Sequence, residues 1–166
     1  MVRTVLRTLA FLALAALVVA DPVGPTQPWG IHTAYGAEGG STSLTFMWST
    51  RAAVAASVVA ISAPAPANYS GEAIAFSEGG NVQTLHRVRV TGLTPGTAYT
   101  YTVGDGGAST SRAHSVSTQP ASPAAWQPTL AVFGDMGISS NAQATMPLLL
   151  ADAAAGRIDA VLHVGG

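Results

Sequence analysis

The stretch LHRVRVTGLTPGTAYTYTVG, residues 85–104, carries the clearest pattern in the sequence. Its first half alternates, so that His86, Val88 and Val90 share one face of a strand and arginines occupy the other face. Alternation returns at residues 99–104, after a turn that contains proline and glycine. Short alternating runs separated by such turns are typical of a β-sandwich or barrel.

The turn in this stretch has the arrangement of a tyrosine corner. Leu93 precedes a turn at Pro95 and Gly96, and Tyr99 opens the next strand. In such a corner the tyrosine hydroxyl bonds back to the upstream backbone. The stretch therefore resembles a fibronectin type III domain, which is a sandwich of two β-sheets.

Further strand candidates surround this stretch. In SLTFMWST, residues 43–50, Leu44, Phe46 and Trp48 fall on one face. Glycine and proline turns separate the candidates, which are residues 43–50, 57–62, 73–77, 84–91, 99–104 and 112–118. The pattern predicts an all-β, fibronectin type III-like sandwich over residues 21–118.

Aromatic and histidine side chains within these runs are interpreted as packing residues rather than as a ligand site. Packing is the usual role of aromatic side chains in strands, and no histidine has a second ligand at metal-binding spacing. The interpretation covers Phe46, Trp48, Tyr99, Tyr101, His32, His86 and His114. No residue of the chain is assigned as catalytic.

Composition excludes several classes of function. The 166 residues have a formal net charge of −1, only 9% are charged, and neither cysteine nor lysine occurs. The absence of cysteine excludes a disulfide framework, a zinc knuckle, an iron–sulfur cluster and a thiol nucleophile. The near-neutral charge argues against binding to nucleic acid, because no basic stripe is present.

Residues 1–20 have the layout of a secretory signal peptide. Arg3 and Arg7 precede a short apolar run, and small residues stand before Asp21. The alternative is a membrane anchor, but the apolar run is shorter than the span of about 20 residues that a bilayer requires. We therefore expect a secreted protein without a stable membrane span after cleavage.

A candidate N-glycosylation site lies in the middle of the predicted sandwich. Asn68, Tyr69 and Ser70 form the acceptor triplet, which is a weak pattern because it often arises by chance. The nearby Pro64 and Pro66 suggest an exposed loop.

The pattern changes after residue 118. Residues 119–128, with three prolines in QPASPAAWQP, are typical of a semi-rigid linker. Two short apolar runs follow, at residues 129–133 and 159–164, and each suits a strand of a parallel sheet. The segment 129–166 therefore predicts the beginning of an α/β domain, a strand–helix–strand unit with a right-handed crossover.

The residues between these two strands have helical composition. Residues 142–155 read AQATMPLLLADAAA, and Gly156 suits the position after a helix. Pro147 leaves two alternatives open, which are a helix that starts near Met146 or a kink.

Asp135 is the one candidate metal ligand. It follows the first apolar run within Gly134-Asp135-Met136-Gly137, at the edge where the carboxyl ends of parallel strands meet and ligands bind. A carboxylate between glycines can approach a hard metal ion closely. The alternative is a turn aspartate that bonds to its own backbone.

Taken together, the strand patterns, the linker, LAVFGDMG and DAVLHVGG resemble the amino-terminal part of a purple acid phosphatase of the metallophosphoesterase superfamily. The resemblance implies a secreted enzyme that hydrolyses phosphate monoesters at a dinuclear metal site, with iron paired with zinc, manganese or a second iron. It implies that Asp135 ligates one metal. The order of the motifs is more specific than any single motif.

The sequence departs from the family pattern at its second motif. Gly165 matches the glycine of that motif, but Gly166 stands where the resemblance would place a metal-bridging aspartate. A motif tyrosine and later asparagine and histidine ligands are absent from the 166 residues. His163 and Asp159 are interpreted as structural.

We expect from this that residues 129–166 are the incomplete start of a metallophosphoesterase domain, and that the chain is an inactive amino-terminal fragment. One alternative is a non-catalytic, secreted interaction module with a vestigial catalytic tail. Another is a membrane-tethered form that retains residues 1–20.

Overall fold

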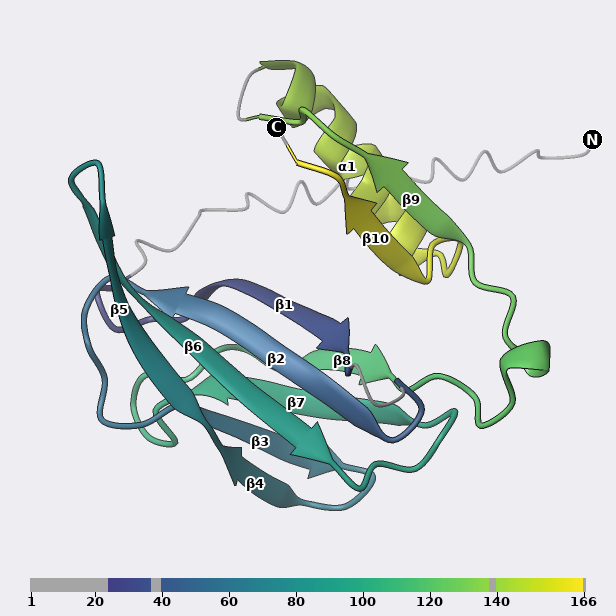
Figure 1. Ribbon diagram of the computed structural model, residues 1–166, viewed down its shortest axis with the longest axis horizontal. Coiled ribbons are helices and arrows are strands. Elements are labelled where there is room, and N and C mark those ends of the chain that lie inside the picture. The colour runs from purple at the N-terminus through teal and green to yellow at the C-terminus, as the bar shows by residue number, and fades with distance from the viewer. Residues whose placement is uncertain (1–23, 37–39, 138–139, 166) are drawn as a thin grey trace, which may run out of the picture.

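The computed structural model describes residues 24–36, 40–137 and 140–165, so the predicted signal peptide lies outside the described residues. The chain forms a β-sandwich followed by a small α/β unit, which lies beside strand β1 (Figure 1). The elements are β1 (Trp29–Tyr35), β2 (Ser43–Thr50), β3 (Val58–Ala63), β4 (Ala67–Ser70), β5 (Glu72–Glu78), β6 (Asn81–Thr91), β7 (Ala98–Gly104), β8 (His114–Ser117), the 3-10 turn η1 (Pro123–Ala125), β9 (Leu130–Phe133), α1 (Ser140–Ala154) and β10 (Ala160–His163).

Two four-stranded antiparallel sheets form the sandwich. Their strand orders are β1-β2-β6-β5 and β4-β3-β7-β8. The predicted alternation is confirmed, because Phe46 pairs with Val88 and both side chains are fully buried. The ring of Phe46 meets that of Tyr101 edge-on, with ring centroids 4.7 Å apart, which joins the two sheets. The expected all-β sandwich with a following α/β segment is therefore confirmed.

The tyrosine corner is present as predicted. The hydroxyl of Tyr99 accepts a hydrogen bond of 2.8 Å from the backbone N–H of Thr94. Thr118 closes the same corner from the end of the sandwich, because its hydroxyl donates to Thr94 O at 2.7 Å and accepts from Thr97 N at 2.9 Å. The likeness of this sandwich to fibronectin type III domains stays a prediction.

Two strands correct the sequence interpretation. β1 lies where no individual strand was assigned, and β4 lies where a proline-flanked loop around Asn68 was expected. Residues 64–66 form the exposed loop that the prolines suggested, but Asn68 pairs with Ala60 of β3, so the loop does not extend to Asn68. Both prolines precede β4 and do not interrupt it, and a four-residue strand at the edge of a sheet tolerates them there.

Gly71 is the point at which the chain crosses from one sheet to the other. It stands between β4 of the second sheet and β5 of the first. Its backbone N–H donates to Ser57 O at 3.0 Å, and a Cβ atom here would overlap the carbonyl oxygen of Arg87 and lie 2.8 Å from Val88 Cα. The crossing therefore requires the backbone of residue 71 to pack directly on β6, which only glycine permits.

A buried histidine links three strands and the segment that precedes β3. His86 on β6 is 2% exposed, with Thr50 Oγ1 2.9 Å from Nε2 and Ser57 Oγ 2.8 Å from Nδ1. Thr50 donates its hydroxyl proton to Ala52 O at 2.6 Å, so it accepts from Nε2. Ser57 Oγ also lies 3.1 Å from the carbonyl oxygen of Glu72 on β5. The predicted packing role of His86 is confirmed, and it includes hydrogen bonds to two buried hydroxyls.

This arrangement predicts that the sandwich loses stability in acid. Burial lowers the pKa of His86 below its ordinary value of 6.5, so the fold favours neutral imidazole. The stabilisation is complete above pH 6.5 and is lost as the pH falls toward the lowered pKa, because the unfolded chain then binds a proton that the folded chain does not. Urea unfolding of the chain at neutral pH and at pH about 5 measures this loss.

His86→Gln should remove a part of this pH dependence. His114 contributes in the same direction, because burial and the neighbouring Arg112 lower its pKa. A free energy of unfolding that does not change with pH in the unsubstituted chain would contradict the prediction.

The segment after the sandwich is attached to it at two points. Gln119 N donates to Gly40 O at 3.0 Å, and the ring of Trp126 meets that of Tyr35 on β1 edge-on at 5.6 Å. Burial and, second, the negative charge of Asp159 raise the pKa of Tyr35 above its ordinary value of 10.0. The predicted linker is therefore held against the sandwich around Trp126.

Helix α1 begins before Met146, the start that one of the two sequence alternatives gave. It starts at Ser140 and contains Pro147, so a start near Met146 was wrong. At the other end Gly156 is left-handed, with φ 67°, as predicted. Gly156 N donates to Ala153 O, and Arg157 N donates to Asp152 O at 2.9 Å, which is the hydrogen-bond pattern of a Schellman cap. Among the described residues, no helix combines the length and apolar character needed to cross a bilayer.

Candidate metal-binding edge

The two strands of the α/β unit are parallel, and their carboxyl ends form one edge. Leu130–Phe133 of β9 pair in register with Ala160–His163 of β10. Beyond the strands the pairing continues, because Val164 N donates to Phe133 O at 2.9 Å and Asp135 N donates to Gly165 O at 2.8 Å. Asp135 therefore lies at this edge directly beside Gly165, as the predicted strand–helix–strand unit requires.

The backbone at this edge is unusual. Asp135 has φ 50°, and it is the one non-glycine residue with positive φ in the described parts of the chain. Its neighbour Gly134 is equally constrained, since a Cβ there would lie 3.0 Å from Gly165 O and from Val164 Cγ2. Left-handed non-glycine residues are strained and cluster at functional sites. The backbone at Gly134 and Asp135 therefore packs closely against residues 164 and 165, and the side chain of Asp135 is exposed.

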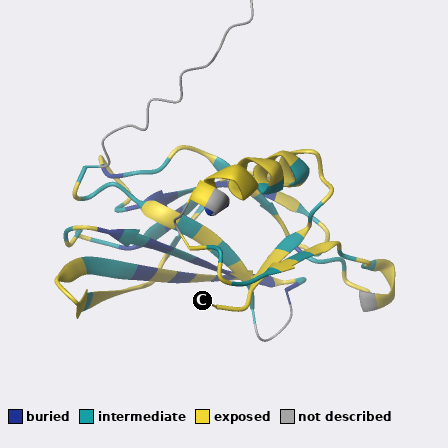
Figure 2. Cartoon of the chain, turned by 90° about the horizontal axis from the view of Figure 1, so that it is seen from above, coloured by how far each residue is buried: buried dark blue, intermediate teal, exposed yellow. Residues whose placement is uncertain are grey.

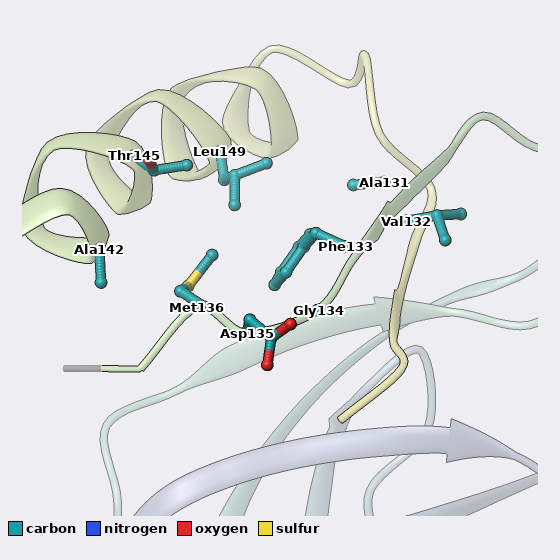
Figure 3. Close-up of a pocket in the computed structure, with 9 residues that line it drawn as sticks. All are labelled: Ala131, Val132, Phe133, Gly134, Asp135, Met136, Ala142, Thr145 and Leu149. Carbon is teal, nitrogen blue, oxygen red and sulfur yellow. The ribbon is translucent and has the colours of Figure 1, made fainter. Parts of the chain in front are cut away.

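An open hollow of about 490 Å³ separates this edge from α1. Ala142, Thr145 and Leu149 approach it from one face of the helix, and Phe133 and Met136 approach it from β9 and the following loop (Figure 3). Figure 3 shows the carboxylate of Asp135 on the side away from the helix. Thr145 and Met136 were not among the predicted site residues. The helical spacing of residues 142, 145 and 149 would have indicated the common face that includes Thr145.

The other charged and histidine residues of the unit have structural contacts. Asp159 Oδ2 accepts from Thr129 N at 2.8 Å, at the entry of the strands and not at their carboxyl ends. The ring of His163 meets that of Phe133 at 5.3 Å, with an interplanar angle of 77°. Both contacts agree with the structural roles that the sequence indicated for Asp159 and His163.

The donor set does not fit a dinuclear metal centre. Within residues 24–36, 40–137 and 140–165, no group of three or more histidine, cysteine, aspartate or glutamate side chains is arranged to hold a metal ion. Two adjacent metals need several ligands, and carboxylates that bridge them. Asp135 supplies one exposed carboxylate, and Gly166 lies outside the described residues. Metal ligation by Asp135 stays a prediction.

Comparison with known proteins places the sandwich within a described family. The family "Purple acid Phosphatase, N-terminal domain" matches residues 28–118. "Acid phosphatase type 7" of Mus musculus is 37% identical over 144 residues, which cover 83% of this chain and 32% of that protein. The protein of the same name from Homo sapiens is 35% identical over 162 residues, which cover 93% of this chain and 36% of that protein. The chain thus spans about a third of the length of these relatives.

Proposed function

Because this chain belongs to the purple acid phosphatase family, we propose that it forms the amino-terminal part of a secreted, metal-dependent acid phosphatase. The substrates that we propose are phosphate monoesters. The observation that carries the proposal is the position of Asp135, a left-handed aspartate at the carboxyl edge of a parallel strand pair, within a chain whose sandwich matches this family.

The exposed apolar side chains of the α/β unit support the proposal that this unit is part of a larger domain. Leu130 and Val132 of β9 and Leu162 of β10 face away from α1 and are about half exposed or more. The helix is also largely exposed, whereas the buried residues are concentrated in the sandwich (Figure 2). A parallel sheet is normally covered on both faces, so further structure would be needed to bury these side chains.

We propose that Asp135 is one ligand of a dinuclear centre of iron with zinc, manganese or a second iron. The remaining ligands would come from outside the described residues, since a single carboxylate cannot hold two metals. No step of hydrolysis is therefore assigned to the side chains of this chain. Its contribution would be to hold one carboxylate in a fixed position at the strand edge.

The proposal predicts that the 166 residues alone do not hydrolyse phosphate esters. The chain, expressed with its own residues 1–20 in a secreting host, would be assayed with p-nitrophenyl phosphate in acid with iron, zinc and manganese. We expect the rate of the buffer blank, because one carboxylate does not form the metal centre. A longer protein that contains these residues and the missing ligands should be active.

Two outcomes would contradict the proposal. Metal-dependent hydrolysis by the 166 residues would show that the described donor set is sufficient. The absence of hydrolysis by the longer protein with its metals bound would exclude the phosphatase function and favour the non-catalytic interaction module.

A further inference from the structure

The triplet Asn68-Tyr69-Ser70 is not accounted for by the proposed phosphatase function. We propose that Asn68 carries an N-linked glycan, which rests on the secretory part of the proposed function. The chain has three asparagines, and Asn81 and Asn141 both lack serine or threonine two positions further on. Asn68 is therefore the single position in the sequence that fits the acceptor pattern.

The strand geometry of β4 presents the acceptor to solvent. Side chains alternate along β4, with Asn68 and Ser70 exposed and Tyr69 partly buried against the core of the sandwich. Because Tyr69 fills the inward position, a group attached to Asn68 would project outward without displacing core side chains. The acceptor amide of Asn68 therefore lies on the exposed face of β4, and Tyr69 packs against the core on the other face.

The strand is also at the edge of its sheet. The order β4-β3-β7-β8 leaves one side of β4 unpaired among the described strands, and Asn68 pairs with Ala60 on the other side. Exposed edges can pair with other chains, and proteins often cover or charge them to prevent this. β4 is only four residues long and has no charged side chain, so a bulky hydrophilic glycan at Asn68 would shield this edge.

The chemistry is transfer of an oligosaccharide from a lipid diphosphate donor of the secretory pathway. A bond forms between Asn68 Nδ2 and the anomeric carbon of the first sugar. The bond between that carbon and the diphosphate oxygen breaks, and the lipid diphosphate leaves with its electron pair. The amide nitrogen loses one proton to a base of the transferring enzyme, and no oxidant or reductant is needed.

The test is expression of the 166-residue chain in a eukaryotic secreting host, with its own residues 1–20 and, separately, with a leader of known function in their place. We expect a glycan that peptide N-glycosidase removes, leaving aspartate at position 68 in the peptide mass spectrum. Asn68→Gln and Ser70→Ala should both abolish the modification. Ser70→Thr and the matched control Asn81→Gln should retain it.

Secreted protein with unmodified Asn68 would overturn the proposal. The second leader separates a failure of secretion from a failure of glycosylation. A chain that reaches the medium only with the foreign leader would contradict the prediction that residues 1–20 are a signal peptide, and its Asn68 would still test the glycan. Sedimentation of the glycosylated chain and of Asn68→Gln tests the shielding role. We expect self-association to increase in Asn68→Gln, and equal association would overturn that role.

Discussion

Replacement of Gly71 by alanine is expected to destabilise the sandwich by about 3 kcal/mol. The added Cβ would overlap the carbonyl oxygen of Arg87 and press on Val88 Cα, and both atoms belong to the backbone of β6. Strand β6 pairs with β2 on one side and β5 on the other, so it cannot yield without loss of pairing on both sides. Urea unfolding monitored by tryptophan fluorescence measures the change.

Gly24→Ala is the matched control for this prediction. A Cβ at Gly24 would meet only the flexible side chain of Gln27, at an ordinary contact distance of 3.6 Å. We expect a change within about 0.5 kcal/mol. Equal stability of Gly71→Ala and the control would show that the crossing between the sheets does not need glycine.

Substitution of Asp135 is expected to reduce phosphatase activity at least about 100-fold in the longer enzyme that we propose. Asp135→Asn removes the negative charge and keeps a residue that tolerates the left-handed conformation. Asp135→Gly removes the carboxylate and relieves the strain at the observed φ of 50°. Both variants should lose activity and bound metal together, while their thermal unfolding stays close to that of the parent.

Asp152→Asn is the control for charge removal in the same unit. The carboxylate of Asp152 accepts a hydrogen bond of 3.0 Å from Arg157 Nε at the end of α1, away from the Asp135 edge. We expect full activity from this variant. Full activity of Asp135→Asn and Asp135→Gly would contradict metal ligation. It would favour the alternative from the sequence, in which Asp135 is a turn residue that bonds to its own backbone.

Much of the sandwich could be predicted because its local and global patterns agree. The alternation in residues 43–50 and 84–91 reappears as buried faces of β2 and β6, and the turn before Tyr99 forms the expected corner. β1 and β4 were not predicted because their local patterns are weak, although each pairs with the strand next to it in the sequence. β1 carries a register shift between Trp29 and His32, and β4 depends on β3.

The start of α1 was left open by the sequence, because Pro147 allowed two alternatives. Pro147 cannot donate its backbone hydrogen bond within the helix, which suggested a start near Met146. The helix nevertheless begins at Ser140, and Ala142, Thr145 and Leu149 line the same hollow as Phe133 of β9. Residues on both sides of Pro147 therefore share one helical face, as their helical composition allows.

The position of the candidate site could be predicted from the sequence, whereas its backbone geometry could not. The crossover rule for parallel strands placed Asp135 beside the end of the second strand, where it bonds to Gly165. The left-handed backbone at Asp135 and the close approach at Gly134 come only from the three-dimensional structure. That the ligand set is incomplete was already expected from the second motif, where Gly166 stands in place of an aspartate.

The most direct test of the proposed phosphatase is the metal content of the native protein, purified from its natural source and assayed with a phosphate monoester. We predict two metal ions per chain, one of them iron, and hydrolysis in acid that disappears when a chelator removes the metals. A native protein that carries these residues, binds no metal and hydrolyses no phosphate ester would contradict this function and leave the sandwich as an interaction module.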